Sequence, residues 1–123
     1  MAYITDAAFD AALNYIRDNA ENLYICSAEP TSFAQASSSL KLATKALPTI
    51  SVPADRSGGG RELTIAAISD GTVDATGTGT HIAITDDSAS ALLATVALSA
   101  TQVLTAGNTM TLTAFTVGIQ DAV

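Results

Sequence analysis

The sequence has no tryptophan, a single cysteine (Cys26), a single histidine (His81) and few aromatic residues, 5% of the chain. One cysteine cannot form a disulfide within the chain, and with one histidine it cannot supply the ligands of a structural zinc site. The start of the sequence has no basic segment followed by an apolar one, so we expect no signal peptide. We therefore expect synthesis and folding in the cytoplasm, where an unpaired cysteine is common.

Positive charge is also scarce. The formal net charge is −7, and all five basic residues lie at or before Arg61. A strongly acidic surface repels phosphate backbones, which argues against nucleic-acid binding. Every charged side chain in residues 62–123 is acidic, and the 33 residues from Ser88 to Gln120 contain no charged side chain at all.

The uncharged stretch is longer than the roughly 20 apolar residues of a membrane-spanning helix. Serine, threonine, glutamine and asparagine interrupt it every few positions, however, so we expect no membrane insertion. Strands that face the rest of a sheet or a neighbouring subunit explain it better.

The chain is rich in small side chains, with 24 alanines, 17 threonines and 11 serines. Its 123 residues are enough for a single domain, 1–123, with one modest core. Residues 1–22 are predicted to form an N-terminal helix capped by Thr5 or Asp6. The helix has an apolar stripe, and we also expect Tyr15 to pack into the core. The stripe consists of Phe9, Leu13, Ile16 and Ala20.

Residues 23–61 are predicted to form an extended or arm region with a glycine-rich loop. Leu23–Ser27 is typical of a strand, in which Cys26 would be buried. A helical turn is possible over 31–36, and a second extended region is expected from Ser37. Pro48 and Pro53 bracket a segment that we interpret as an edge strand or arm. Residues 55–61 are predicted to be a hairpin or connecting loop, whose arginines could contact an acidic neighbour.

Residues 62–123 are predicted to form successive strands. Turns are expected at Asp70–Gly71, at 86–88 and at 106–108, and the alternation places Met110 and Leu112 inward. The glycines between 73 and 80 indicate bulges or close backbone contacts. The sequence thus predicts a mainly β fold, a single-domain β-sandwich or barrel-like structure with an N-terminal α-helix.

No residues form a convincing catalytic or binding motif. His81 and Asp86 could be combined with one of many hydroxyls into a triad, but no G-x-S-x-G motif accompanies them. Gly58–Gly60 lacks the Lys-Ser or Lys-Thr pair of a phosphate-binding loop. Asp86 and Asp87 could join Asp70 or Asp74 around a cation, but these loops lack a ligand at every second position, so we interpret them as solvated turns. We therefore predict no enzyme activity, no catalytic residues, no cofactor, no metal and no small-molecule substrate.

Several segments resemble small structural proteins of tailed bacteriophages. The resemblance covers nearly the whole chain and is weakest over 37–61. Its segments are Phe9–Ile16, Leu23–Thr31, Gly71–Ile84, Leu92–Thr95 and Thr105–Leu112. It implies a component of the virion, a homo-oligomer whose partners are the major capsid protein or other virion proteins.

Three positions for such a protein follow from physical arguments. A head decoration, or cement, protein needs uncharged surface and reaching arms, which 88–120 and 37–53 would supply. A neck, collar or tail component along the DNA path would suit the negative charge. A receptor- or glycan-binding β-domain is disfavoured, since the chain has no tryptophan to stack on sugars. We expect head decoration first.

Overall fold

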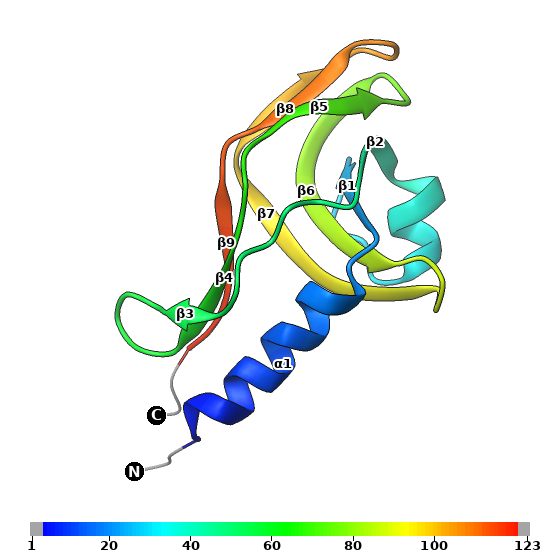
Figure 1. Ribbon diagram of the computed structural model, residues 1–123. Coiled ribbons are helices and arrows are strands. Elements are labelled where there is room, and N and C mark those ends of the chain that lie inside the picture. Colours follow the sequence, from blue (N-terminus) through cyan, green and yellow to red (C-terminus); the bar gives the residue numbers. More distant parts are fainter. Residues whose placement is uncertain (1–3, 121–123) are drawn as a thin grey trace.

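The computed structural model describes residues 4–120, a mainly β structure with one N-terminal α-helix (Figure 1). This confirms the fold class predicted from the sequence. In chain order the elements are α1 (Asp6–Asn19), β1 (Asn22–Cys26), the π-helical η1 (Gln35–Ser39), β2 (Lys41–Ala46), β3 (Ala54–Asp55), β4 (Arg61–Ile65), β5 (Ile68–Val73), β6 (Gly77–Asp86), β7 (Ala91–Leu104), β8 (Thr109–Leu112) and β9 (Phe115–Ile119).

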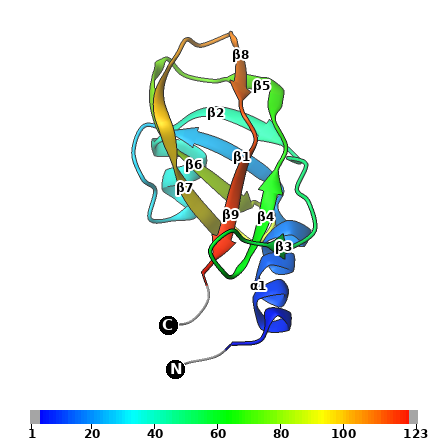
Figure 2. The same ribbon diagram turned by 90° about the vertical axis from the view of Figure 1, so that its left-hand side faces the viewer.

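The larger sheet has six strands in the order β7-β6-β1-β2-β5-β8. All neighbouring strands in it are antiparallel. Figures 1 and 2 show that the sheet curls, so that its two edge strands approach each other. The result is the barrel-like form that the sequence predicts.

The smaller sheet has the order β3-β4-β9 and is continuous with the larger one. Ile65 of β4 pairs with Phe115, and Ile68 of β5 pairs with Leu112, so the segments β4–β5 and β8–β9 form one long antiparallel pair that contributes to both sheets. The predicted turn at Asp70–Gly71 is wrong, because both residues lie within β5. Gly71 serves close packing instead, since a Cβ atom there would lie 2.6 Å from Cε of Met110.

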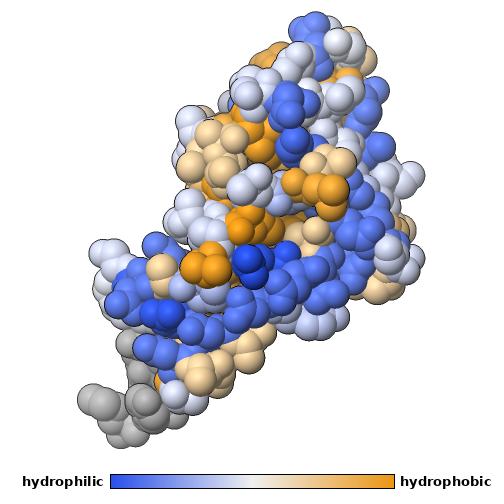
Figure 3. Space-filling view, viewed as in Figure 1, coloured by the Kyte–Doolittle hydropathy of each residue, from blue (hydrophilic) through white to orange (hydrophobic). Residues whose placement is uncertain are grey.

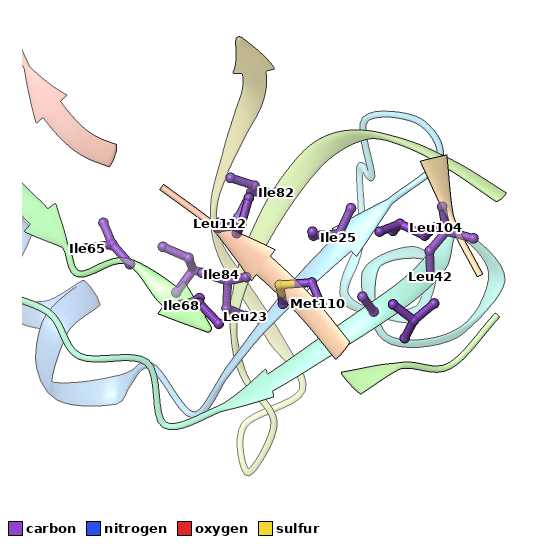
Figure 4. Packing of buried hydrophobic residues seen from close by; sticks show 12 residues of the cluster. Leu23, Ile25, Leu42, Ile65, Ile68, Ile82, Ile84, Leu104, Met110 and Leu112 are labelled. Carbon is purple, nitrogen blue, oxygen red and sulfur yellow. The ribbon is translucent and has the colours of Figure 1, made fainter. Parts of the chain in front are cut away.

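The core fills the curl of the larger sheet (Figure 4). Met110 is fully buried and Leu112 is 9% exposed, which confirms the predicted inward face of β8. The predicted role of the glycines is also confirmed. A Cβ at Gly77 would lie 2.9 Å from Leu42, and the β6–β7 register shifts just after Gly79.

The N-terminal helix is confirmed over Asp6–Asn19, with Phe9 and Leu13 buried, but it ends before the predicted residue 22, because Asn22 already begins β1. Thr5 occupies the N-cap position without a side-chain bond to the helix, and the predicted residues 1–3 lie outside the described part of the chain. The prediction that Tyr15 packs into the core is wrong, because its side chain is 58% exposed. At 100° per residue it lies about 200° around the helix from Leu13, on the face turned away from the protein. The side chain of Arg61 in β4 holds the helix by two bonds to Asp10, of 2.8 and 3.1 Å.

Residues 37–53 differ most from expectation. Ser37–Ser39 belong to η1 instead of an extended segment, and Ser37 Oγ donates to the Phe33 carbonyl at 2.8 Å. β2 lies between β1 and β5, so it is a central strand and not a free arm. The edge predicted between the prolines is confirmed, since Ile50 forms a bridge with Ile65 beside β4.

Candidate functional site

The structure does not bring His81 and Asp86 together. Both lie on β6, five positions apart, so their side chains point to opposite faces about 17 Å apart along the strand. His81 Nδ1 lies 2.9 Å from Thr80 Oγ1, and Nε2 lies 3.9 Å from Glu29 Oε2. The residues of the triad considered above are therefore not assembled around this histidine.

Cys26 and His81 are direct partners across the β1–β6 pair, an arrangement that the sequence left open. Cys26 is completely buried, as predicted, and its thiol donates to the Ala36 carbonyl at 3.7 Å. Burial raises the pKa of this thiol to about 11. The sulfur is thus protonated near neutral pH, which makes it a poor nucleophile.

The four aspartates considered as cation ligands are divided between separate contacts. Asp70 pairs with Lys45 at 3.0 Å, and Asp74 lies 3.7 Å from Lys41 Nζ. Within residues 4–120, no group of three or more histidine, cysteine or acidic side chains is placed to hold a metal ion.

Asp87 instead forms a small hydrogen-bonded cluster at the end of β6. Its carboxylate accepts bonds from Tyr24 Oη (2.7 Å) and Thr85 Oγ1 (2.5 Å). Burial opposes ionisation of Asp87, but these bonds outweigh it and lower its pKa. Burial, followed by the bond to Asp87, raises the pKa of Tyr24. Because each polar group in this cluster has a partner, the cluster stabilises the turn between β6 and β7.

Close by, Glu21 and Asp86 are two acidic side chains whose pKa values move in opposite directions. Hydrogen bonding to Glu21 is the main cause of a raised pKa for Asp86, whereas bonding to Ser88 lowers the pKa of Glu21. Glu21 Oε1 accepts the Ser88 main-chain N–H at 2.7 Å. The contact thus joins the end of α1 to the β6–β7 turn.

The glycine-rich segment is the loop of the β3–β4 hairpin, as predicted. Gly58, Gly59 and Gly60 all have positive φ angles, of 87°, 103° and 100°. Arg61 binds Asp10 and Asp55 in its own chain, and contact of the loop arginines with an acidic neighbour stays a prediction. These bonds, first that of Asp10, raise its pKa further above the usual value.

The uncharged stretch forms the surface that best suits contact with other proteins. It contains all of β7, β8 and β9, of which β8 and β9 follow one another end to end in Figure 2. Gln102 Nε2 of β7 donates to the Thr111 carbonyl of β8 at 2.9 Å and so joins the two edges of the curled sheet. Beside this bond, a hollow of about 370 Å³ extends between residues 98–102 and 111–113.

The face seen in Figure 3 has hydrophilic side chains along α1 and separate apolar patches over the strands above it. Large apolar side chains are also exposed outside the helix, and Val103 of β7 is 83% exposed. Sequence reasoning identified the uncharged stretch but missed Gln102. The sequence feature that could have identified Gln102 is its amide side chain between two β-branched residues, Thr101 and Val103.

Comparison of the chain with protein families, with curated proteins and with solved structures found no match. Among residues 4–120, no helix has both the length and the apolar character needed to cross a membrane.

Proposed function

We propose that this protein is a non-enzymatic structural component of a tailed-bacteriophage virion, and that it acts as a decoration or cement protein on the head. The observation that carries the proposal is the position of the uncharged stretch, which supplies β7, β8 and β9, three of the four edge strands of the two sheets. Uncharged, hydroxyl-rich strands suit repeated contacts with capsid subunits, because no charge has to be desolvated or paired.

The resemblance of the sequence to small phage structural proteins supports the same proposal. The expected arm does not, because β2 is a central strand of the sheet. Support from the structure therefore comes from β7, β8 and β9. The acidic charge of −7 favours the second candidate, a ring at the neck, collar or tail, where acidic walls would repel passing DNA.

Counting copies in purified particles separates these candidates. Quantitative mass spectrometry of purified virions of a phage that encodes the protein should find hundreds of copies if it decorates the head. A count of about six or twelve would indicate a ring of cyclic symmetry and overturn the head position. Absence from the particle would overturn both.

Binding to heads gives an independent test. Recombinant protein, mixed at micromolar concentration with undecorated heads, should sediment with them. Val103→Asp should weaken this binding, because it places a charge at an exposed position of the uncharged surface. Thr31→Asp, at an exposed position of the β1–η1 loop, is the matched control and should bind like the wild type.

A further inference from the structure

Three of the four sheet edges are protected against pairing with another strand. β3 has two residues, follows Pro53 and contains Asp55, whose side chain is 89% exposed. β7 has two shifts in its register with β6. β8 is partly covered by the side chain of Gln102. Short length, proline, charge and bulges are the features by which proteins prevent edge-to-edge association.

The fourth edge, β9, has none of these features. Its five residues pair with β4 in unbroken register, and they include neither proline nor a charged side chain. Figure 2 shows β9 at the front of the molecule, beside β4.

The direction of the free backbone groups of β9 follows from its neighbour. The N–H and C=O of Thr64 bond to Ser51, so they point away from β9. Because these directions alternate along a strand, Leu63 bonds to Val117. The N–H and C=O groups of Thr116 and Gly118 therefore point outward, and within residues 4–120 they have no hydrogen-bond partner.

We propose that β9 pairs with β9 of a second copy of this chain, antiparallel and about a two-fold axis at Val117. The two small sheets then become one six-stranded sheet, in the order β3-β4-β9 followed by the same strands of the second copy in reverse. Such an interface uses the same surface on both copies and closes as a dimer.

The pattern of β9 is complementary to itself in this register. Phe115 lies opposite Ile119 of the second copy, and Thr116 lies opposite Gly118. The two Thr116–Gly118 pairs each exchange two backbone hydrogen bonds, which satisfies all the outward groups. Phe115, Val117 and Ile119 are half-buried and share one face, so the pairing joins two apolar stripes into one.

The charge distribution favours a second copy as the occupant even though each chain carries −7. On the adjacent strand the acidic side chain is Glu62, opposite Gly118. The two β4 strands would be three strand spacings apart, about 14 Å, which exceeds the Debye length of about 8 Å at physiological ionic strength. Repulsion at this interface is therefore largely screened. A strand with charged side chains would find no opposite charge on β9.

Cross-linking gives the direct test. In a non-hydrogen-bonded antiparallel pair the two Cα atoms are about 4.5 Å apart, within the range of a disulfide. Val117→Cys should therefore form a covalent dimer under mild oxidation. Thr64→Cys is the matched control, because it is exposed on the next strand and would lie too far from its counterpart to react.

Sedimentation of the wild-type chain over a range of concentrations should show a monomer–dimer equilibrium. Thr116→Pro should shift it to the monomer, since proline removes an outward N–H and leaves the bonds to β4 intact. Cross-linking of Val117→Cys no faster than Thr64→Cys, or a monomer at every concentration, would overturn the proposal. That result would leave the copy number in particles unaffected, so it is distinguishable from failure of the proposed function.

Discussion

The side chain of Gln102 and the main chain of Thr111 join the two edges of the curled sheet. In a closed barrel, backbone hydrogen bonds between the two edge strands would make this connection. The amide nitrogen of Gln102 donates to the Thr111 carbonyl at 2.9 Å. Its amide oxygen is buried and, among the described residues, has no hydrogen-bond partner. The contact therefore has opposing energetic effects, since a bond is gained and a polar atom is left unpaired.

Replacing Gln102 by methionine should change the free energy of unfolding by less than about 1 kcal/mol, because both effects are removed together. Hydrogen exchange of the β8 amides should nevertheless become faster, since the bond to Thr111 is lost. Mass spectrometry of exchanging peptides measures this. Val103→Met, at an exposed neighbouring position, is the control and should leave the protection of β8 unchanged. Equal protection in both variants would contradict a closing role for Gln102.

Gly79→Ala should destabilise the protein by about 1–3 kcal/mol, as expected when a packed core receives an extra methyl group. The new Cβ would collide with Cγ2 of Ile25, a fully buried and β-branched side chain. Gly71→Ala should cost less, because its closest neighbour is the flexible end of Met110. Urea denaturation of both variants measures the difference, and the reverse order would show that Ile25 can move more easily than Met110.

Met110→Asp should unfold the domain, because an unpaired charge in the core costs several kcal/mol, on the order of the whole stability. Thr109→Asp, on the same strand but exposed, should remain folded. Far-UV circular dichroism and urea denaturation distinguish the two outcomes. A folded Met110→Asp variant would contradict the inward face of β8.

Stability should fall as the pH rises above about 9. Cys26 and Tyr24 have ordinary pKa values of 9.0 and 10.0, and burial raises both in the folded protein. The unfolded chain therefore releases these protons first, so the stabilisation is complete below pH 9 and is lost as the pH rises through the folded-state values.

Urea denaturation between pH 8 and pH 11 measures this loss. Cys26→Ala should flatten the first part of the decline, and Tyr24→Phe should flatten the part above pH 10. Comparison of slopes corrects for the stability that each substitution removes at every pH. If the stability of both variants declines with the same slope as that of the wild type, the loss of stability comes from other titrating groups.

Local patterns of the sequence predicted the fold class and most of the strands. The apolar stripe of α1 and the alternation of β8 worked because burial on one face leaves a periodic signal. The prediction of a turn at Asp70–Gly71 was wrong because glycine occurs both in turns and where a side chain packs closely on the backbone. Here Gly71 allows Met110 to approach the backbone. The chain turns instead at 74–76, between β5 and β6.

The candidate surface could be predicted in part. The absence of charge marked residues 88–120 directly, but strand order decides which of their edges remain open, and order depends on contacts distant in sequence. The free backbone groups of Thr116 and Gly118 follow only from the position of Ser51 beside β4. Arg61 shows the same limit, since its partner Asp10 lies 51 residues away.

The small sheet also makes the two ends of the molecule different. α1 begins and β9 ends at the same pole, while the turns after β5 and β7 lie at the opposite one (Figure 1). The ends of the described chain, residues 4 and 120, lie at this one pole, so a reporter joined through a short linker would be held close to the proposed two-fold axis. Reporters on two paired copies would then be neighbours, so energy transfer between donor- and acceptor-labelled chains could follow assembly without altering the opposite pole.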